Sequence, residues 1–111
     1  MTIEHPTLAS GRWAALSLSE QMANIGSEVE RAISWHKKGN EEYSKKAFYR
    51  ALELISISID VHMGEKGKIK ELTRLREGLG DYFVGDNHFK SSDRLFQSYF
   101  LAFNFAARRN K

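Results

Sequence analysis

The sequence predicts an all-α protein folded as an antiparallel up-and-down four-helix bundle with an irregular N-terminal segment. Apolar residues recur every three or four positions along four successive segments of the 111 residues, a spacing that places them on one face of a helix. Short polar or glycine-containing stretches separate the segments, and short connections favour antiparallel neighbours. The length suits one core, so we expect residues 1–111 to form a single domain.

The first 16 residues are expected to be irregular. Residues 1–16 contain the single proline, Pro6, and a Ser-Gly pair follows it, and both features are typical of turns and loops. Trp13 is expected to pack against the bundle, because an exposed indole would leave a large apolar area in water.

Helix-capping residues indicate where the first two helices begin and end. The first helix is expected over about 18–38, since Ser17 and Glu20 have the spacing of a capping box and Gly39 supplies a left-handed stop. Asn40 is a good N-cap, so the second helix is expected to begin directly after Gly39. The two helices are then antiparallel neighbours.

The second helix contains a conflicting pattern. Residues 55–62 alternate apolar and polar side chains, as a half-buried strand does. We favour a helix, because the sequence has no second alternating run with which a strand could pair.

The third helix is expected over about 68–84. The fourth is expected to open at Ser91, Ser92 and Asp93, with Phe89 closing the end of the bundle.

The segment Leu95–Ala107 is expected to organise the bundle, because it carries two adjacent rows of apolar side chains. One row is Leu95, Tyr99, Ala102, Phe103 and Ala106, and the other is Phe96, Phe100, Phe103 and Ala107. Together they form an apolar face that is wider than a two-helix seam needs, which indicates a helix embedded among several others.

Composition excludes several classes of chemistry. The chain has no cysteine, which excludes disulfides, thiolate metal sites, iron–sulfur clusters and cysteine nucleophiles. No apolar run approaches the length of about 20 residues that spans a bilayer, and the first ten residues lack the layout of a signal peptide. We therefore expect a cytoplasmic protein that does not bind a membrane.

The positive charge lies in the second half of the chain. Residues 1–64 carry seven Lys and Arg against eight Asp and Glu, whereas residues 65–111 carry ten against six, which accounts for the net charge of +3. Such a distribution is able to attract phosphate-rich partners, including nucleic acid. We favour a solvated face and a basic tail, because +3 is small beside most nucleic-acid-binding domains and no known module is present.

A search for metal, nucleotide and nucleophile motifs gives no strong candidate. Glu-x-x-His pairs, which hold metals inside helical bundles, are absent from the sequence, as are a phosphate-binding loop and a serine elbow. The spacings Asp60-x-His62 and Asp86-x-His88 are the nearest to a metal pair, and we interpret both as surface residues in turns. We therefore expect no metal and no cofactor.

One short motif suggests a catalytic alternative. The segment Arg31–His36 has the Arg-x4-His spacing and resembles the signature of HEPN domains, small helical bundles that include RNases and partners of minimal nucleotidyltransferases. The resemblance implies that His36 would be the acid–base group and that Arg31 would stabilise phosphate charge.

Two rows of polar residues follow helical spacing and are candidates for binding a partner. The rows are Asn24, Glu28 and Arg31 on the first helix and Arg74, Glu77 and Asp81 on the third. The simpler interpretation is that they are exposed ladders of ion pairs. The sharper hypothesis is that the rows face one another across a groove.

Seven short segments spread over most of the chain carry a second resemblance: 18–29, 50–54, 81–83, 91–93, 99–100, 102–104 and 106–108. Through them the chain resembles an uncharacterised family of small bacterial helical-bundle proteins. The resemblance implies a helical bundle and assigns no catalytic residue.

The function we favour is a noncatalytic interaction or accessory protein that forms a homodimer and binds an unknown protein partner. Four apolar residues lie off the main helix faces and are candidates for the dimer contact: Ile57, Val61, Leu101 and Phe105. The alternatives are an HEPN-like RNA-directed protein or nucleotidyltransferase partner that uses Arg31 and His36, and small-ligand binding in an aromatic pocket between the second and fourth helices.

Overall fold

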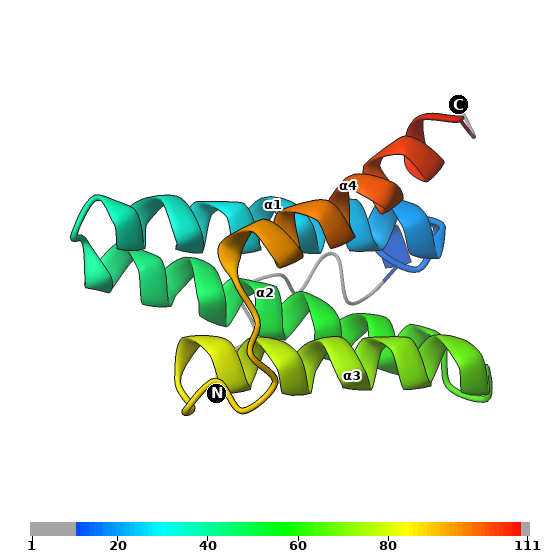
Figure 1. Ribbon diagram of the computed structural model, residues 1–111. Coiled ribbons are helices and arrows are strands. Elements are labelled where there is room, and N and C mark those ends of the chain that lie inside the picture. Colours follow the sequence, from blue (N-terminus) through cyan, green and yellow to red (C-terminus); the bar gives the residue numbers. More distant parts are fainter. Residues whose placement is uncertain (1–10, 110–111) are drawn as a thin grey trace.

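The computed structural model describes residues 11–109 and confirms the prediction of an all-α four-helix bundle. The helices are α1 (Leu18–Lys37), α2 (Glu41–Val61), α3 (Lys66–Phe83) and α4 (Asp93–Arg109), and no strand occurs among the described residues (Figure 1). Of the expected irregular segment 1–16, residues 1–10 lie outside the described part of the chain, and residues 11–16 form turns that precede α1.

The four helices pack in the order α3, α2, α1, α4. The most extensive contact joins α1 and α2, which lie side by side and antiparallel (Figure 1). On this pair, α3 packs against α2 and α4 packs against α1. Each of the outer helices therefore has one main neighbour, and the seam between α3 and α4 is the loosest of the bundle.

The expected capping interactions are present. Ser17 Oγ accepts a hydrogen bond from the backbone N–H of Glu20, whose carboxylate in turn accepts one from the Ser17 N–H. Gly39 has a φ of +80°, which glycine adopts without steric strain. Asn40 Oδ1 accepts from the N–H of Tyr43 at 3.0 Å. These local interactions stop α1 and restart the chain as α2 almost at once.

The alternating stretch 55–62 belongs to α2 except for its last residue, His62, which caps the helix. Ile55, Ile57 and Ser58 are all buried. Because α2 lies between α1 and α3, it is covered on two sides and requires a wider apolar face than an outer helix. The alternation thus reflects burial on two sides of a helix.

Trp13 docks against α2, as expected from the sequence. Its side chain is 2 % exposed, and its Nε1 donates a hydrogen bond of 2.8 Å to Ser58 Oγ. The Trp13 carbonyl accepts from Nε2 of Gln21 at 3.0 Å, and the Gln21 side chain is fully buried. The segment before α1 is therefore tied to both central helices by bonds that satisfy its polar atoms.

The same polar network continues to the turn between α2 and α3. His62 Nε2 lies 2.7 Å from Gln21 Oε1, and His62 Nδ1 lies 2.6 Å from a carboxylate oxygen of Glu65. Hydrogen bonds from Lys68 and His62 hold the pKa of Glu65 below its usual value. This chain of contacts links the start of α1 to the start of α3.

Candidate functional site

The helix α4 rests on α1 through a close aromatic contact. Phe100 packs on Gly26 so tightly that a Cβ added at Gly26 would lie 2.7 Å from Cγ of the ring. Phe96, one turn earlier, is also buried. The missing side chain at Gly26 is therefore what lets the backbone of α1 accept the Phe100 ring.

The first residue of α4 is tied to two other helices. Asp93 Oδ1 accepts a 2.5 Å hydrogen bond from the hydroxyl of Tyr82 on α3, and Asp93 Oδ2 lies 3.8 Å from Nζ of Lys37 on α1. Partial burial and the bond to Asp93 raise the pKa of Tyr82 to about 12. Tyr82 therefore stays protonated and keeps donating at neutral pH.

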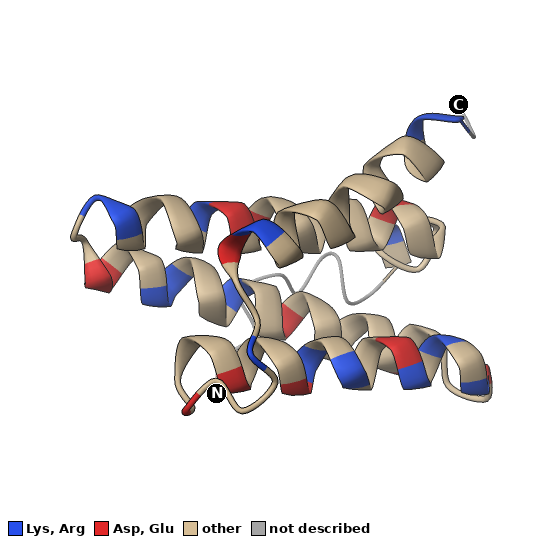
Figure 2. Cartoon of the chain, in the orientation of Figure 1, with Lys and Arg blue, Asp and Glu red and all other residues tan. Residues whose placement is uncertain are grey.

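The outward side of α4 carries exposed apolar residues that surround one exposed serine, Ser98. We define the α4 stripe as Leu95, Leu101, Ala102 and Phe105. Leu95 and Leu101 are 53 % exposed and Phe105 is 58 % exposed. On an ideal helix the four positions fall within an arc of about 120°, away from the buried Phe96 and Phe100. Figure 2 shows α4 free of charged residues between its two ends.

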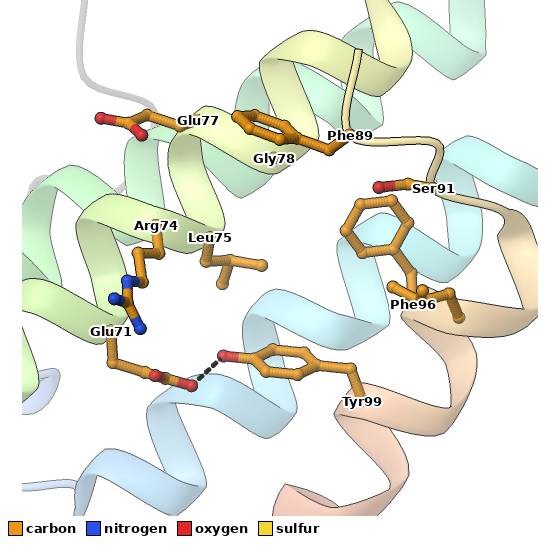
Figure 3. A pocket seen from close by; sticks show the side chains of 10 residues that line it. Glu71, Arg74, Leu75, Glu77, Gly78, Phe89, Ser91, Phe96 and Tyr99 are labelled. Carbon is orange, nitrogen blue, oxygen red and sulfur yellow. Dashed lines mark hydrogen bonds between the residues drawn. The ribbon is translucent and has the colours of Figure 1, made fainter. Parts of the chain in front are cut away.

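A groove of about 470 Å³ runs between α3 and α4. Tyr99 on α4 crosses it and donates a 2.5 Å hydrogen bond from its hydroxyl to Glu71 on α3 (Figure 3). Burial and the neighbouring Glu71 carboxylate raise the pKa of Tyr99 well above its usual range. The lining is Glu71, Arg74, Leu75, Glu77, Gly78, Phe89, Ser91, Leu95, Phe96 and Tyr99.

The expectation that Phe89 closes the end of the bundle is wrong, because its side chain is 64 % exposed. The carboxylate of Asp81 accepts hydrogen bonds from the backbone N–H groups of His88 and Phe89, at 2.8 and 3.0 Å. These bonds hold the loop against the last turns of α3. The Phe89 ring consequently lies beside Gly78 at the rim of the groove (Figure 3).

The first predicted polar row belongs to α1 and its contact with α2. The side chain of Asn24 donates to the carbonyl of Glu20 in its own helix. Glu28 is buried and accepts from Arg31 at 2.5 Å and from Arg50 of α2 at 2.9 Å. The Arg50–Glu28 pair joins the two central helices, whereas the Arg31–Glu28 pair lies within α1.

The second predicted polar row lies elsewhere. Arg74 and Glu77 line the groove whose other wall is α4, and Asp81 holds the loop that follows α3. The structure therefore places the two rows in separate sets of contacts and does not bring them together across one groove.

The four predicted dimer-contact residues have different environments. Leu101 and Phe105 are exposed and belong to the α4 stripe. Val61 is partly buried against the core. The prediction for Ile57 is wrong: it is 7 % exposed within the single chain, because α2 is covered on two sides.

The structure does not bring Arg31 and His36 together. Positions five residues apart on a helix point about 140° away from each other. Arg31 is bonded to Glu28, whereas Nδ1 of His36 lies 2.6 Å from Glu41. Each member of the Arg-x4-His pair thus has its own carboxylate partner.

The histidines of the two metal-like spacings also have separate surroundings. The interpretation of His62 as a surface residue is wrong, because it is buried in the polar network with Gln21 and Glu65. His88 is exposed and lies 3.7 Å from Asp86. Within residues 11–109, no three acidic or histidine side chains are grouped so that they could hold a metal ion.

Comparison with known proteins gives a single result. No family model, curated protein or solved structure matches the chain. Among the described helices, none combines the length and the apolar character that crossing a bilayer requires.

Sequence reasoning missed the groove between α3 and α4. It placed an aromatic pocket between the second and fourth helices, whereas the groove that receives Phe96 and Tyr99 is walled by α3. The available signal was the row Leu95, Tyr99, Ala102, Phe103 and Ala106. It showed a second apolar face on the fourth helix, but a pattern within one helix does not say which neighbour covers that face.

Proposed function

We propose that the chain is a noncatalytic interaction module that pairs with a second copy of itself through α4. The observation that carries this proposal is the α4 stripe. The apolar residues of a helix normally face a neighbour that buries them, but α4 packs mainly against α1 and leaves Leu95, Leu101 and Phe105 in water. A second surface would remove this apolar area from water.

The composition of α4 makes its outward side easy to cover. Residues 95–107 contain no charged side chain, so a partner that packs on the stripe buries no ion there. Burying an unpaired charge is the usual large cost of forming an interface. The charges of α4 lie at its two ends, in Asp93 and Arg94 and in Arg108 and Arg109.

A second copy is the occupant that best fits the shape of this surface. A two-fold contact requires one patch that is complementary to itself. The protruding Leu101 and Phe105 lie on the same helix as Leu95, which both belongs to the stripe and lines the groove. One surface therefore offers projecting apolar side chains beside an apolar depression.

Sedimentation equilibrium of the intact chain tests this proposal. We expect a monomer–dimer equilibrium in the wild type and weaker association in a double variant, Leu101→Asp with Phe105→Asp. Fully burying a Leu or Phe side chain is worth about 1.5–3 kcal/mol, so each substitution is expected to weaken the association at least about tenfold.

The matched control is Met63→Asp, which adds the same charge to an exposed apolar residue in the turn after α2, outside the α4 stripe. It is expected to associate like the wild type. Circular dichroism of all three proteins checks that the helices are retained. A wild type that remains monomeric at every concentration, or a folded double variant that still forms dimers, contradicts the proposal.

A further inference from the structure

The turn between α1 and α2 carries a second surface whose chemistry differs from that of α4. Trp35 and Tyr43, on the two sides of this turn, meet edge to face with their ring centres 4.9 Å apart and their planes at 81°. Tyr43 is 45 % exposed and Trp35 is partly exposed. Two aromatic rings thus reach solvent together.

Three cations surround these rings. Nζ of Lys38 lies 5.0 Å from the centre of the Trp35 ring, and Nζ of Lys46 lies 5.5 Å from that of Tyr43. Arg50 lines the same hollow of about 230 Å³ as both rings. Figure 2 shows these basic positions along the turn and the first half of α2.

A hydrogen bond to a largely buried carboxylate fixes the position of Arg50. Its Nε donates a 2.9 Å hydrogen bond to Glu28, whose side chain is only 11 % exposed. The contact uses Nε, and within residues 11–109 no acceptor is bonded to the two terminal nitrogens of the guanidinium, which are also donors. Glu28 is therefore a positioning residue that keeps the Arg50 guanidinium beside the rings.

We propose that this aromatic–cationic patch, formed by Trp35, Lys38, Tyr43, Lys46 and Arg50, binds single-stranded nucleic acid. Proteins that bind single strands without reading sequence combine aromatic rings on which bases stack with cations that contact the phosphates. Both components are present here, within one hollow and its rim.

The lysines show how the rings become available to a base. The ammonium group of a solvated lysine lies over each ring. One face of each ring is therefore accessible from solvent. A lysine side chain is flexible and its cation–π contact at an exposed site is worth only about 0.5–1 kcal/mol. Each lysine therefore moves aside at small cost, contacts a phosphate and leaves the ring face to a base.

The acidic neighbours do not prevent phosphate binding. Glu42 lies 3.5 Å from Lys46, and both side chains are more than half exposed, so the ion pair is weak and exchanges readily. Glu28 lies beneath Arg50 and not at the surface. An acidic peptide would use the three cations alone, whereas the paired rings favour a ligand that also carries flat bases.

Tryptophan fluorescence offers a direct test on the intact chain. The protein has two tryptophans, and Trp13 is buried with 2 % exposure, so quenching by a bound base reports on Trp35. The probes are a 12-nucleotide oligo(U) RNA, a 12-nucleotide oligo(dT) DNA, free uridine monophosphate and polyglutamate. We expect both oligonucleotides to quench, and the mononucleotide to bind at least about tenfold more weakly because it offers one base and one phosphate.

Variants locate the binding site. Tyr43→Ala is expected to bind oligo(U) about tenfold more weakly through the loss of stacking, and Arg50→Gln through the loss of a phosphate contact. Three phosphate contacts predict a slope of about −2 in the logarithm of affinity against the logarithm of salt concentration. Tyr49→Ala is the control, since Tyr49 is a similarly exposed tyrosine of α2 that does not line the hollow.

Several outcomes would overturn the proposal: no quenching by either oligonucleotide at low salt, wild-type affinity in folded Tyr43→Ala, or polyglutamate binding as tightly as the oligonucleotides. Tighter binding of one of the two oligonucleotides identifies whether the patch prefers RNA or DNA. The patch lies outside the α4 stripe, so this test does not depend on whether the chain forms dimers.

Discussion

The α1–α2 pair and the α3–α4 pair show two ways of packing antiparallel helices. Between α1 and α2, Ala32, Ala47 and Ala51 are fully buried, and Ser44 Oγ donates a 2.7 Å hydrogen bond to the Ala32 carbonyl. Small side chains there allow close approach of the backbones. Between α3 and α4, a tyrosine–glutamate bond crosses an open groove.

The two helix pairs therefore contribute to different properties: one to the stability of the fold and the other to interaction with a partner. The α1–α2 pair, together with Trp13 and its polar network, forms the closed side of the bundle and supplies buried area and satisfied hydrogen bonds. The α3–α4 pair forms the open side and leaves aromatic and leucine side chains in water. These exposed side chains do not stabilise the fold until another surface covers them. We therefore expect substitutions on the closed side to change folding, and those on the α4 stripe to change association.

The largest expected effect comes from breaking the closed side at Trp13. Trp13→Ala removes a fully buried indole and leaves Ser58 without its donor, which is expected to cost about 3–5 kcal/mol in the free energy of unfolding. Urea denaturation followed by circular dichroism measures the loss. Tyr49→Ala, at an exposed aromatic position, is expected to change stability by less than about 0.5 kcal/mol. Equal losses would contradict the distinction.

The next effect tests how α4 is held on α1. Gly26→Leu forces Phe100 away from α1 and is expected to lower the free energy of unfolding by about 1–3 kcal/mol through overpacking. Gly78→Ala is the matched control, because a Cβ there meets no atom within 4 Å. It is expected to raise stability by up to about 1 kcal/mol through helix propensity. A stabilised Gly26→Leu would mean that α4 is not docked on Gly26.

Alkaline pH is expected to weaken the contacts that Tyr82 and Tyr99 make from α3 and α4. Both tyrosines have raised pKa values in the folded state, whereas an unfolded tyrosine ionises near pH 10. The unfolded state therefore loses protons first, and stability falls as pH rises above about 10. For Tyr82 this fall ends near its folded pKa of about 12.

Denaturation at pH 8 and at pH 11 measures this effect. Tyr82→Phe and Tyr99→Phe are each expected to be less stable than the wild type at pH 8, by about 0.5–1.5 kcal/mol for one lost hydrogen bond, and to lose less stability between the two pH values. A variant as alkali-sensitive as the wild type would show that its tyrosine is not the group that titrates.

The smallest expected effect concerns Glu65, at the turn before α3. Its pKa lies below the usual value because Lys68 and His62 donate hydrogen bonds to it, so its contribution to stability is present above about pH 4.5 and is lost as pH falls through its folded pKa. Glu65→Gln is expected to show a slightly shallower loss of stability between pH 5 and pH 3, measured by thermal melting. An identical acid profile would rule out this contribution.

Local features of the fold were predictable from the sequence because neighbouring residues determine them. The capping box at Ser17 and Glu20, the left-handed Gly39 and the N-cap Asn40 all act within one turn of the residues they stabilise. The helix-period pattern likewise identified all four helices, because its apolar faces need only some partner and not a specified one.

The site was less predictable because it depends on which helices become neighbours. Ile57 lies off the main face of its helix and was expected at a dimer contact, but α2 is covered on two sides and buries it. Gly26 was visible as a small residue, yet nothing local identified Phe100 as the ring that packs on it. The Tyr99–Glu71 contact joins residues 28 positions apart, beyond the range of helical spacing.

The most direct test of the central claim is a distance measurement between two copies of the chain. Because the protein has no cysteine, Ala102→Cys places one nitroxide label in the α4 stripe, and Ser56→Cys places one on the exposed side of α2 as a control. Pulsed electron–electron double resonance is expected to show a defined intermolecular distance between labels at position 102. This distance is expected to be shorter than the distance between labels at position 56. An absence of intermolecular coupling at every protein concentration, or a shorter distance at position 56, would contradict the account.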